Sequence, residues 1–265
     1  MLRDQRVVVV MPAYNAATTL EVTHREVLDQ GVVDLVIIVD DRSRDETASI
    51  AARLPRTILH VHEANRGYGA NQKSCYRLAL EQGADIVVMV HPDYQYAPQL
   101  IPAMTALIAC GLYPCVLGSR ILGGRALAGG MPWWKYVSNR LLTAFGNLCM
   151  GAKLSEYHTG YRAYSRRLLE SLALERNSDG FLFDNQILAQ ILWQGHTIAE
   201  VTCPTRYFAE ASSIGLGRSI VYGVGCVATA LHYRLARLGL ASARPFEPVG
   251  QPASSASTPS SAANR

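Results

Sequence analysis

Short runs of apolar, mostly β-branched residues recur along the first part of the chain, separated by stretches with helical spacing. Continuous apolar runs of this length are typical of strands that are buried on both faces of a parallel sheet. The pattern predicts strands at 7–11, 35–39, 57–62 and 86–90 and helices at 18–30, 45–54 and 69–82. Strands that alternate with helices at this spacing imply right-handed βαβ crossovers. We therefore predict an α/β fold with a mostly parallel central sheet.

The pattern beyond residue 98 is mixed. It predicts helices at 99–110, 134–150 and 183–193, short strands at 115–118 and 198–201, and a Gly-rich stretch at 123–130. We expect one large domain over residues 1–210, followed by a C-terminal helix within 211–240. Residues 241–265 are mostly Ala, Ser and Pro without periodicity, so we expect a disordered tail that cannot bury enough apolar surface to fold.

The C-terminal helix carries a long apolar segment at 219–235, with Arg218 before it and Arg234 and Arg237 near its end. This segment is short for a membrane span. An amphipathic helix with a basic margin could lie on a membrane surface. The alternative is a helix that packs on the domain or in a dimer interface, and the sequence leaves both open.

Composition and charge narrow the classes of function. Of the 265 residues, 49% are hydrophobic and 17% are charged, which excludes collagen-like, coiled-coil and wholly disordered chains. A net charge of +4 suits anionic ligands or a membrane surface, and is far from that of a nucleic-acid-binding protein. The six cysteines are scattered, as expected for buried thiols in a reducing compartment. No signal peptide is visible, so we expect a cytoplasmic protein.

Polar residues follow each of the four predicted strands directly, at 12–15, 40–43, 63–67 and 91–95. Ligands of open parallel sheets bind beyond the carboxyl ends of the strands. The four segments should therefore line one rim of the sheet and form the candidate site.

Two adjacent carboxylates, Asp40 and Asp41, end the second strand. A carboxylate in this position can accept a hydrogen bond from a nucleobase or from a ribose hydroxyl. Ser43 and Asp45 follow them, and helix capping explains these two residues equally well. Capping does not require two carboxylates at a strand end, so we favour ligand binding for Asp40 and Asp41.

The sequence His91-x-Asp93-x-Gln95 follows the fourth strand and places three polar side chains on one face of an extended segment. Carboxylate and carboxamide oxygens are hard ligands that suit Mg²⁺ or Mn²⁺ bridging a diphosphate. A polar turn around Pro92 is the alternative. A zinc site is disfavoured, because no cysteine or second histidine stands at ligand spacing.

The loop at 65–71 is rich in glycine and opens a helix, so that backbone amides could approach a phosphate. A plain junction between loop and helix explains it equally well. Basic residues cluster around the expected second half of the site, and most would be solvated: Arg120, Arg125, Lys135, Arg140, Arg162 and Arg206. Arg120 directly follows a strand and Arg162 lies in a Thr-Gly-Tyr-Arg segment, so these two are candidate phosphate ligands.

Several motifs, in the order in which they follow one another along the chain, resemble those of a known enzyme family. The segments VVMPAYN at 9–15, VDDRSRDET at 39–47 and HPDYQ at 91–95 resemble glycosyltransferase family 2, which has the GT-A fold, a Rossmann-like nucleotide-diphospho-sugar transferase fold. The segments GSR at 118–120 and EYHTGYRAY at 156–164 resemble its dolichol-phosphate mannose synthase-like branch. The resemblance covers about residues 7–210.

The resemblance implies an inverting transferase that moves a sugar from a nucleoside-diphosphate sugar, often to a polyprenyl phosphate at the cytoplasmic face of a membrane. The nucleotide sugar would be bound by Pro12, Ala13, Tyr14, Asn15, Asp40, Asp41, Asn65 and Gly67. Asp93 and Gln95 would hold a divalent metal, Mg²⁺ or Mn²⁺. Arg120, with Lys135 or Arg140, would meet the acceptor phosphate, and Arg162 would lie near the phosphates. Asp93, Arg120 and Arg162 are thus the expected catalytic residues, acting by electrostatic stabilisation of the departing diphosphate.

Two positions depart from the family pattern. His91 replaces a usual carboxylate, which puts metal dependence in question, and Arg42 replaces a usual glycine beside the nucleoside pocket. Two alternatives stay open: transfer to a hydroxyl of a glycan or polysaccharide, with Glu156 or Asp184 as general base, and a non-catalytic nucleotide-sugar-binding protein. The sequence does not determine the sugar, the nucleotide or the oligomeric state. It leaves open whether the protein forms a homo-oligomer.

Overall fold

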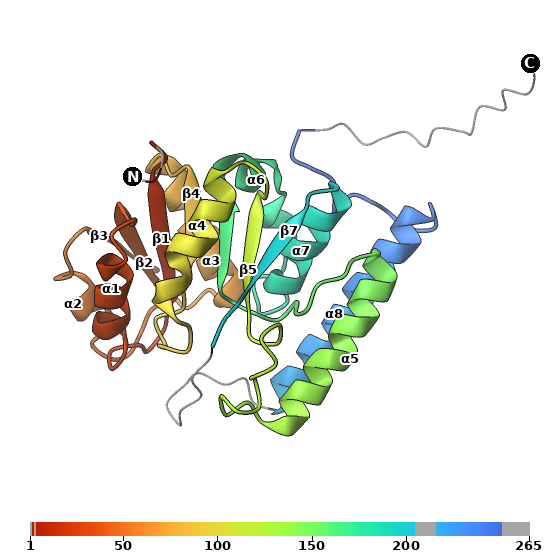
Figure 1. The fold of residues 1–265 in the computed structure, drawn as a ribbon, viewed down its shortest axis with the longest axis horizontal. Helices are drawn as coiled ribbons and strands as arrows, with labels where there is room; N and C mark the ends of the chain where they lie inside the picture. The colour runs from red at the N-terminus through yellow and green to blue at the C-terminus, as the bar shows by residue number, and fades with distance from the viewer. Residues whose placement is uncertain (1, 3, 205–215, 251–265) are drawn as a thin grey trace, which may run out of the picture.

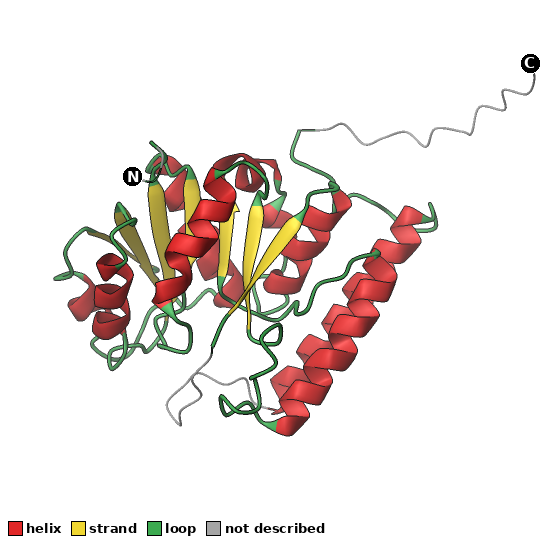
Figure 2. Ribbon diagram, in the orientation of Figure 1, coloured by secondary structure: helices red, strands yellow, loops and turns green. Residues whose placement is uncertain are grey.

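The computed structural model describes residues 2, 4–204 and 216–250, which form an α/β protein around one seven-stranded sheet. The strand order is β3-β2-β1-β4-β6-β5-β7. Figure 2 shows the strands side by side with helices around them. The strands are β1 (Val7–Ala13), β2 (Leu35–Asp40), β3 (Thr57–Val61), β4 (Ile86–Met89), β5 (Cys115–Ser119), β6 (Arg162–Ser165) and β7 (Ile198–Thr202). All neighbouring strands are parallel except β6, which is antiparallel to both β4 and β5. The predicted α/β fold with a mostly parallel sheet is confirmed.

Helices cover both faces of the sheet. They are α1 (Leu20–Asp29), α2 (Thr47–Ala51), α3 (Tyr68–Glu81), α4 (Ile101–Ala109), α5 (Trp133–Met150), α6 (Arg166–Ser171), α7 (Phe183–Trp193) and α8 (Leu216–Arg237), with short 3₁₀ helices at Pro98–Leu100 and Leu174–Arg176. Alternate residues of β1 enter two separate cores. Val8 and Val10 pack with α3 and α7, whereas Val7 and Val9 pack with α1 and α4. Burial on both faces explains why β1 is apolar at every position.

Strand β6 is the one that the apolar pattern did not predict. It begins at Arg162, whose side chain is fully buried, so the segment lacks the continuous apolar run of the other central strands. An ionised side chain inside a sheet requires polar partners from other segments. Those partners are carbonyl groups of the loop just before β6 and of α7, and they are described with the site below.

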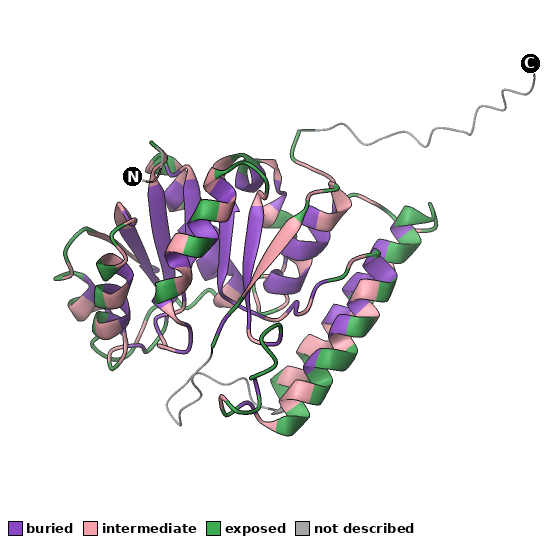
Figure 3. Ribbon diagram, in the orientation of Figure 1, coloured by how far each residue is buried: buried purple, intermediate pink, exposed green. Residues whose placement is uncertain are grey.

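Helices α5 and α8 lie side by side at one end of the molecule, beyond the strands (Figure 1). The predicted helix at 219–235 is confirmed within α8. One side of α8 packs on the domain, where Gly225 approaches the side chain of Leu182 so closely that a Cβ would lie 3.0 Å from it. The other side is exposed to solvent, for example at Val221 and Val224. Figure 3 shows exposed residues along the neighbouring helix α5 as well. Part of the apolar surface of α8 therefore remains exposed although the helix packs on the domain.

The first ten residues of the expected disordered tail are ordered. The ring of Phe246 is buried and stacks on Trp193 at a centroid distance of 5.4 Å. The Arg176 guanidinium donates hydrogen bonds to the carbonyl oxygens of Arg244 and Glu247. The expectation was wrong for 241–250, because one aromatic residue in a polar stretch fills an apolar site on α7 and α8. Residues 251–265 and the expected domain boundary at 210 lie outside the described residues.

The first turn of α3 is closed by the segment 178–180, which predicts a strict requirement for glycine at position 69. The amides of Gly69 and Ala70 both donate to the carbonyl of Asp179, at 2.7 and 3.2 Å. A Cβ on Gly69 would collide with the carbonyl oxygens of Ser178 and Gly180. We expect Gly69→Ala to lower the free energy of unfolding by about 1–3 kcal/mol, as overpacking does, measured by urea denaturation.

The matched control is Gly217→Ala on α8, where a Cβ would meet nothing within 4 Å. This variant should unfold at the urea concentration of the wild type or slightly above it. Equal stability of Gly69→Ala and the wild type would contradict the close approach.

Candidate active site

A cavity of about 1280 Å³ opens at the carboxyl ends of β1, β2 and β4 and continues along α5 and α8. The structure brings most of the predicted site residues together on its walls. These are Pro12, Ala13, Tyr14, Asn15, Asp41, Asn65, Gly67, His91, Asp93, Gln95, Arg120 and Lys135. The predicted rim of the sheet is therefore hollow, with its polar side chains around one space. Asp40, Arg140 and Arg162 do not line the cavity.

The two adjacent carboxylates at the end of β2 have different surroundings. Asp40 is buried and accepts hydrogen bonds from the amide and the hydroxyl of Ser43, so it closes the loop after β2 instead of facing the cavity. Ser43 in turn accepts from the amide of Asn15. The structure thus gives Asp40 a loop-closing position and leaves Asp41 as the carboxylate at the cavity wall.

Asp41 is held by a chain of buried polar groups. Its carboxylate accepts from the amides of Arg66 and Gly67, at 2.8 and 2.9 Å, and lies 2.8 Å from Nδ1 of His62. Nε2 of His62 lies 2.9 Å from the hydroxyl of Ser74. These contacts fix the carboxylate and the Gly-rich loop together. Sequence reasoning missed His62 and Ser74, which carry no local signal because their partner is distant in the chain.

His91 lies at the end of β4 with Tyr68 beside it. The Tyr68 hydroxyl donates to Asp184 at 2.7 Å and is 2.9 Å from Nε2 of His91. Burial lowers the pKa of His91 and outweighs the opposing effect of Asp93. The imidazole at the cavity wall is therefore neutral at pH 7.

The donor set at this point fits a divalent metal that is shared with a diphosphate. It consists of the Asp93 carboxylate, the Gln95 carboxamide and the His91 imidazole, all on the cavity wall. Within the described part of the chain, no group of three or more His, Cys, Asp or Glu side chains could hold a metal by itself. Phosphate oxygens would have to complete the coordination, as they do for Mg²⁺ in nucleotide sites.

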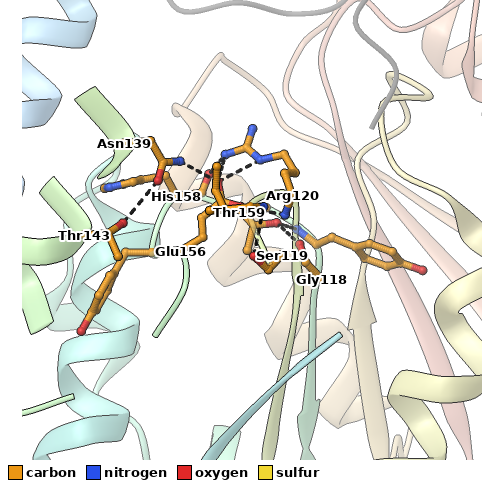
Figure 4. A network of polar contacts seen from close by, with 12 residues as sticks. Gly118, Ser119, Arg120, Asn139, Thr143, Glu156, His158 and Thr159 are labelled. Carbon is orange, nitrogen blue, oxygen red and sulfur yellow. Dashed lines mark hydrogen bonds and ion pairs between the residues drawn. The ribbon is translucent and has the colours of Figure 1, made fainter. Parts of the chain in front are cut away.

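Arg120 is fixed at the cavity wall by Glu156 (Figure 4). Its Nε donates to Oε1 of Glu156 and its backbone amide to Oε2, both at 2.9 Å, and Nη2 donates to the carbonyl of His158. Asn139 of α5 donates to the same carboxylate at 2.8 Å. Burial is the largest single effect and would raise the pKa of Glu156, but the charge of Arg120, the hydrogen bonds from its side chain and backbone amide, and His158 together lower this pKa. A carboxylate that is so held is a poor general base, which disfavours the role in which Glu156 activates a hydroxyl.

Two of the predicted phosphate ligands have other partners. Arg162 is fully buried, and its guanidinium donates to the carbonyls of Tyr157, Thr159 and Asp184, at 2.7 to 3.0 Å. It lies beneath the site, because β6 places it inside the sheet. Arg140 is exposed and donates to the carbonyl of Ser155. We correct both expectations: neither guanidinium faces the cavity. Arg206 lies outside the described residues.

Helix α8 supplies site residues that sequence reasoning missed. Arg218, Ser219 and Tyr222 line the cavity, and the Tyr222 hydroxyl is 2.8 Å from Nδ1 of His158. Burial lowers the pKa of His158 to about 4. The available signal in the sequence was Arg218 at the start of an apolar helix. This signal could not predict that the helix packs against the loop that carries His158.

Helices α5 and α8 add a group of apolar side chains to the cavity wall, beside polar ones such as Lys135 and Arg218. The apolar residues are Trp134, Leu141 and Leu142 on α5, Ile220, Val224 and Val227 on α8, and Met131 just before α5. One continuous cavity therefore joins a polar region at the strand ends to an apolar region between two helices.

Comparison with known proteins assigns the family. A model described as glycosyl transferase family 2 matches residues 8–173, which is more than half of the chain. This chain belongs to glycosyltransferase family 2. It is similar to a polyprenol monophosphomannose synthase of Mycolicibacterium smegmatis, with 25% identity over 74% of this chain and 76% of that protein. It is also similar to an undecaprenyl-phosphate mannosyltransferase of Micrococcus luteus, with 29% identity over 82% of this chain and 91% of that protein.

Solved structures agree with the fold. Glucosyl-3-phosphoglycerate synthase from Mycobacterium tuberculosis, in complex with uridine diphosphate, superposes with a TM-score of 0.67 at 22% identity, over 90% of this chain and 82% of that chain. The same enzyme has been solved with Mg²⁺ or Mn²⁺ and uridine diphosphate. The family-2 chain is therefore a glycosyltransferase with the expected GT-A fold, and its relatives agree with the dolichol-phosphate mannose synthase-like branch.

The buried pair of Arg120 and Glu156 predicts a distinct pH dependence of stability. The pKa of Glu156 in the folded protein lies below its ordinary value of 4.5. Its contribution to stability is therefore present above that value and is lost as the pH falls through the lowered pKa. We expect Glu156→Gln to cost about 3 kcal/mol at pH 7, because it leaves the Arg120 charge unpaired. The difference from the wild type should shrink below about pH 4.

Urea denaturation between pH 3 and pH 8 measures this difference. The control is Glu170→Gln, which removes an exposed pair with Arg166 and should cost less than about 1 kcal/mol at any pH. A pH-independent cost for Glu156→Gln would show that the charge of the carboxylate is not what stabilises the site.

Proposed function

We propose that the chain moves a sugar from a nucleoside-diphosphate sugar to a polyprenyl phosphate, with inversion, at a membrane surface. The observation that carries this proposal is the two-part cavity. A polyprenyl phosphate is an anion attached to a long apolar chain, and the cavity offers cations and an apolar channel in one space. Arg120, Lys135 and Arg218 supply the positive charge.

The nucleoside would occupy the wall formed by the strand ends. Asp41 is fixed there by His62 and the Gly-rich loop, so its carboxylate is preorganised to accept from a ribose hydroxyl or a base. Asn15 holds the neighbouring loop, where its side-chain oxygen accepts from the amide of Arg44 at 2.9 Å. Pro12, Ala13 and Tyr14 complete this wall.

The diphosphate would lie near Asp93 and Gln95, which would hold the divalent metal. When it is bound, the metal neutralises charge on the diphosphate. Arg120 adds a cation whose direction is fixed by Glu156 and by the carbonyl of His158. Preorganised charges of this kind stabilise a transition state without reorganising.

The chemistry needs no general base for this acceptor. A phosphate oxygen attacks the anomeric carbon from the side opposite the diphosphate, the bond from that carbon to the diphosphate oxygen breaks, and the nucleoside diphosphate leaves. The nucleophile is already an anion at neutral pH. This agrees with the carboxylates at the site, since Glu156 is held by Arg120 and Asp184 accepts from Tyr68 and Gln72.

The exposed surface of α5 and α8 supports membrane contact. Large apolar side chains form one stripe along each helix: Trp133, Val137, Leu141 and Leu148 on α5, and Ile220, Val224, Leu231, Leu235 and Leu238 on or beside α8. Exposed stripes of this length are unusual on a monomer in water. Among the described residues, none of the helices has the length and apolar character to cross a bilayer. We propose that the two helices lie on the cytoplasmic face of the membrane with these stripes in the lipid.

The apolar channel predicts how acceptor use should respond to a charge. Val224 lines the cavity from α8. We expect Val224→Asp to lower kcat/KM for a polyprenyl phosphate by about tenfold or more, because a carboxylate in the channel must be desolvated against the lipid chain. The assay is transfer of labelled sugar to polyprenyl phosphate in detergent.

Leu112→Asp is the control, because Leu112 is exposed in the turn after α4 and does not line the cavity. Thermal shift with UDP or GDP should be unchanged in both variants, so that donor binding is separated from acceptor binding. Unchanged acceptor kinetics in Val224→Asp, or transfer only to a soluble glycan, would contradict the proposed acceptor.

The exposed stripes predict binding to lipid vesicles. We expect the double variant Leu148→Asp, Leu235→Asp to bind about tenfold or more weakly to vesicles of phosphatidylcholine and phosphatidylglycerol, because two apolar contacts with lipid are lost. Neither residue lines the cavity, so donor binding should stay as in the wild type. Co-sedimentation measures the partition, again with Leu112→Asp as control. Equal sedimentation of all three proteins would show that this surface does not meet the membrane.

A further inference from the structure

His91 stands where the family usually has a metal-binding carboxylate, and its hydrogen bonds determine which ring nitrogen carries the proton. The Tyr68 hydroxyl has one hydrogen, which it donates to the carboxylate of Asp184 at 2.7 Å. The contact of 2.9 Å between that hydroxyl and Nε2 of His91 therefore requires Nε2 to donate. In the neutral ring the lone pair then lies on Nδ1.

The packing of the ring directs Nδ1 away from Tyr68. The edge that carries Nε2 and Cδ2 lies against the backbone of Gly160, where a Cβ would collide with both atoms and would also lie 3.4 Å from the Tyr68 hydroxyl. The amide of Gly160 is itself held by the hydroxyl of Tyr96 at 2.9 Å. Nδ1 is on the opposite edge of the ring and makes no hydrogen bond to the described residues, and His91 lines the cavity.

This arrangement has the form found around metal-binding histidines. Such a histidine almost always donates its second ring nitrogen to a carboxylate, a carbonyl or a water, which fixes both tautomer and ring orientation. Here the path runs from Nε2 through the Tyr68 hydroxyl to Asp184. Asp184 is supported in turn by Gln72, which donates to Oδ1 at 3.0 Å, and by Arg162 at 3.7 Å.

We propose that His91 is a metal ligand through Nδ1, together with Asp93, and that the site prefers Mn²⁺ or Co²⁺ to Mg²⁺. The inference rests on the proposed function, since the diphosphate would supply the remaining oxygens. Imidazole suits transition metals, whereas Mg²⁺ favours a shell of oxygen atoms alone. A change from carboxylate to imidazole also removes one negative charge, which weakens the attraction of a hard cation. The replacement of the carboxylate by His91 therefore changes the metal preference of the site instead of abolishing metal binding.

The test is direct measurement of metal binding. Mn²⁺ is titrated into the protein and followed by the loss of its free electron paramagnetic resonance signal, alone, with pyrophosphate, and with UDP or GDP. Mg²⁺ competes in the same titration. We expect the wild type to bind Mn²⁺ at least tenfold more tightly than Mg²⁺, and His91→Ala to lose at least tenfold in Mn²⁺ affinity.

Two further variants separate a ligand from a structural residue. His91→Asp should bring the affinities for Mg²⁺ and Mn²⁺ closer together, because it restores an all-oxygen donor set. Tyr68→Phe keeps the ring that stacks on Phe181 but removes the partner of Nε2, and it should weaken Mn²⁺ binding by about 10- to 100-fold. His196→Asp, at a histidine that does not line the cavity, is the control for the change in charge.

The outcomes are separable from those of the proposed function. Binding of UDP or GDP in EDTA, followed by thermal shift, tests the donor site without metal. Equal Mn²⁺ affinity in the wild type and His91→Ala would overturn the inference whether or not a nucleotide binds. Loss of nucleotide binding in EDTA in His91→Ala, with Mn²⁺ affinity for pyrophosphate unchanged, would overturn it too, because it would show that Nδ1 contacts the donor.

Discussion

The site depends on one buried ion pair, between Arg162 of β6 and Asp184 of α7. Arg162 holds three backbone carbonyls of the loop before β6 and of α7, so its charge positions the loop that carries Glu156 and thereby Arg120. Asp184 accepts from Tyr68, which in turn contacts His91. A buried charge that loses its partner costs about 3–5 kcal/mol. The pair therefore couples the geometry around His91 to that around Arg120, the regions proposed for the diphosphate and the acceptor.

The charges of the site suit transfer to an anion better than transfer to a hydroxyl. A hydroxyl acceptor requires a carboxylate or imidazole that can take a proton near pH 7. The pKa of Glu156 is lowered by Arg120, and burial lowers the pKa of His158 to about 4. The pKa values of both groups are thus too low for a general base that works near pH 7. The cations that remain on the cavity wall can instead attract a phosphate and stabilise the leaving diphosphate.

Local pattern was sufficient for the sheet and for the rim of the site. The runs that became β1, β2 and β4 are apolar at nearly every position, and the polar residues after them, such as Asp41 and Asp93, must then meet at one edge. The same pattern could not place Arg162, because a buried cation resembles a solvated one until its carbonyl partners are known. Nor could it distinguish Asp40 from Asp41, since β2 ends at Asp40 and only the contacts of the loop beyond it decide which carboxylate meets the cavity.

The sequence could not predict the contribution of α8 to the site for a different reason. This helix also connects the proposed acceptor channel with the proposed membrane contact. A long apolar helix is compatible with a core, a dimer or a membrane, and its sequence does not distinguish them. In the structure α8 does two things at once: Tyr222 contacts His158 inside the cavity, while Val221 on the exposed side is 74% accessible. The helix that would lie in the lipid is thus also a wall of the channel. A polyprenyl chain that enters between α5 and α8 would therefore stay in apolar surroundings from the bilayer to the point where its phosphate meets the cations.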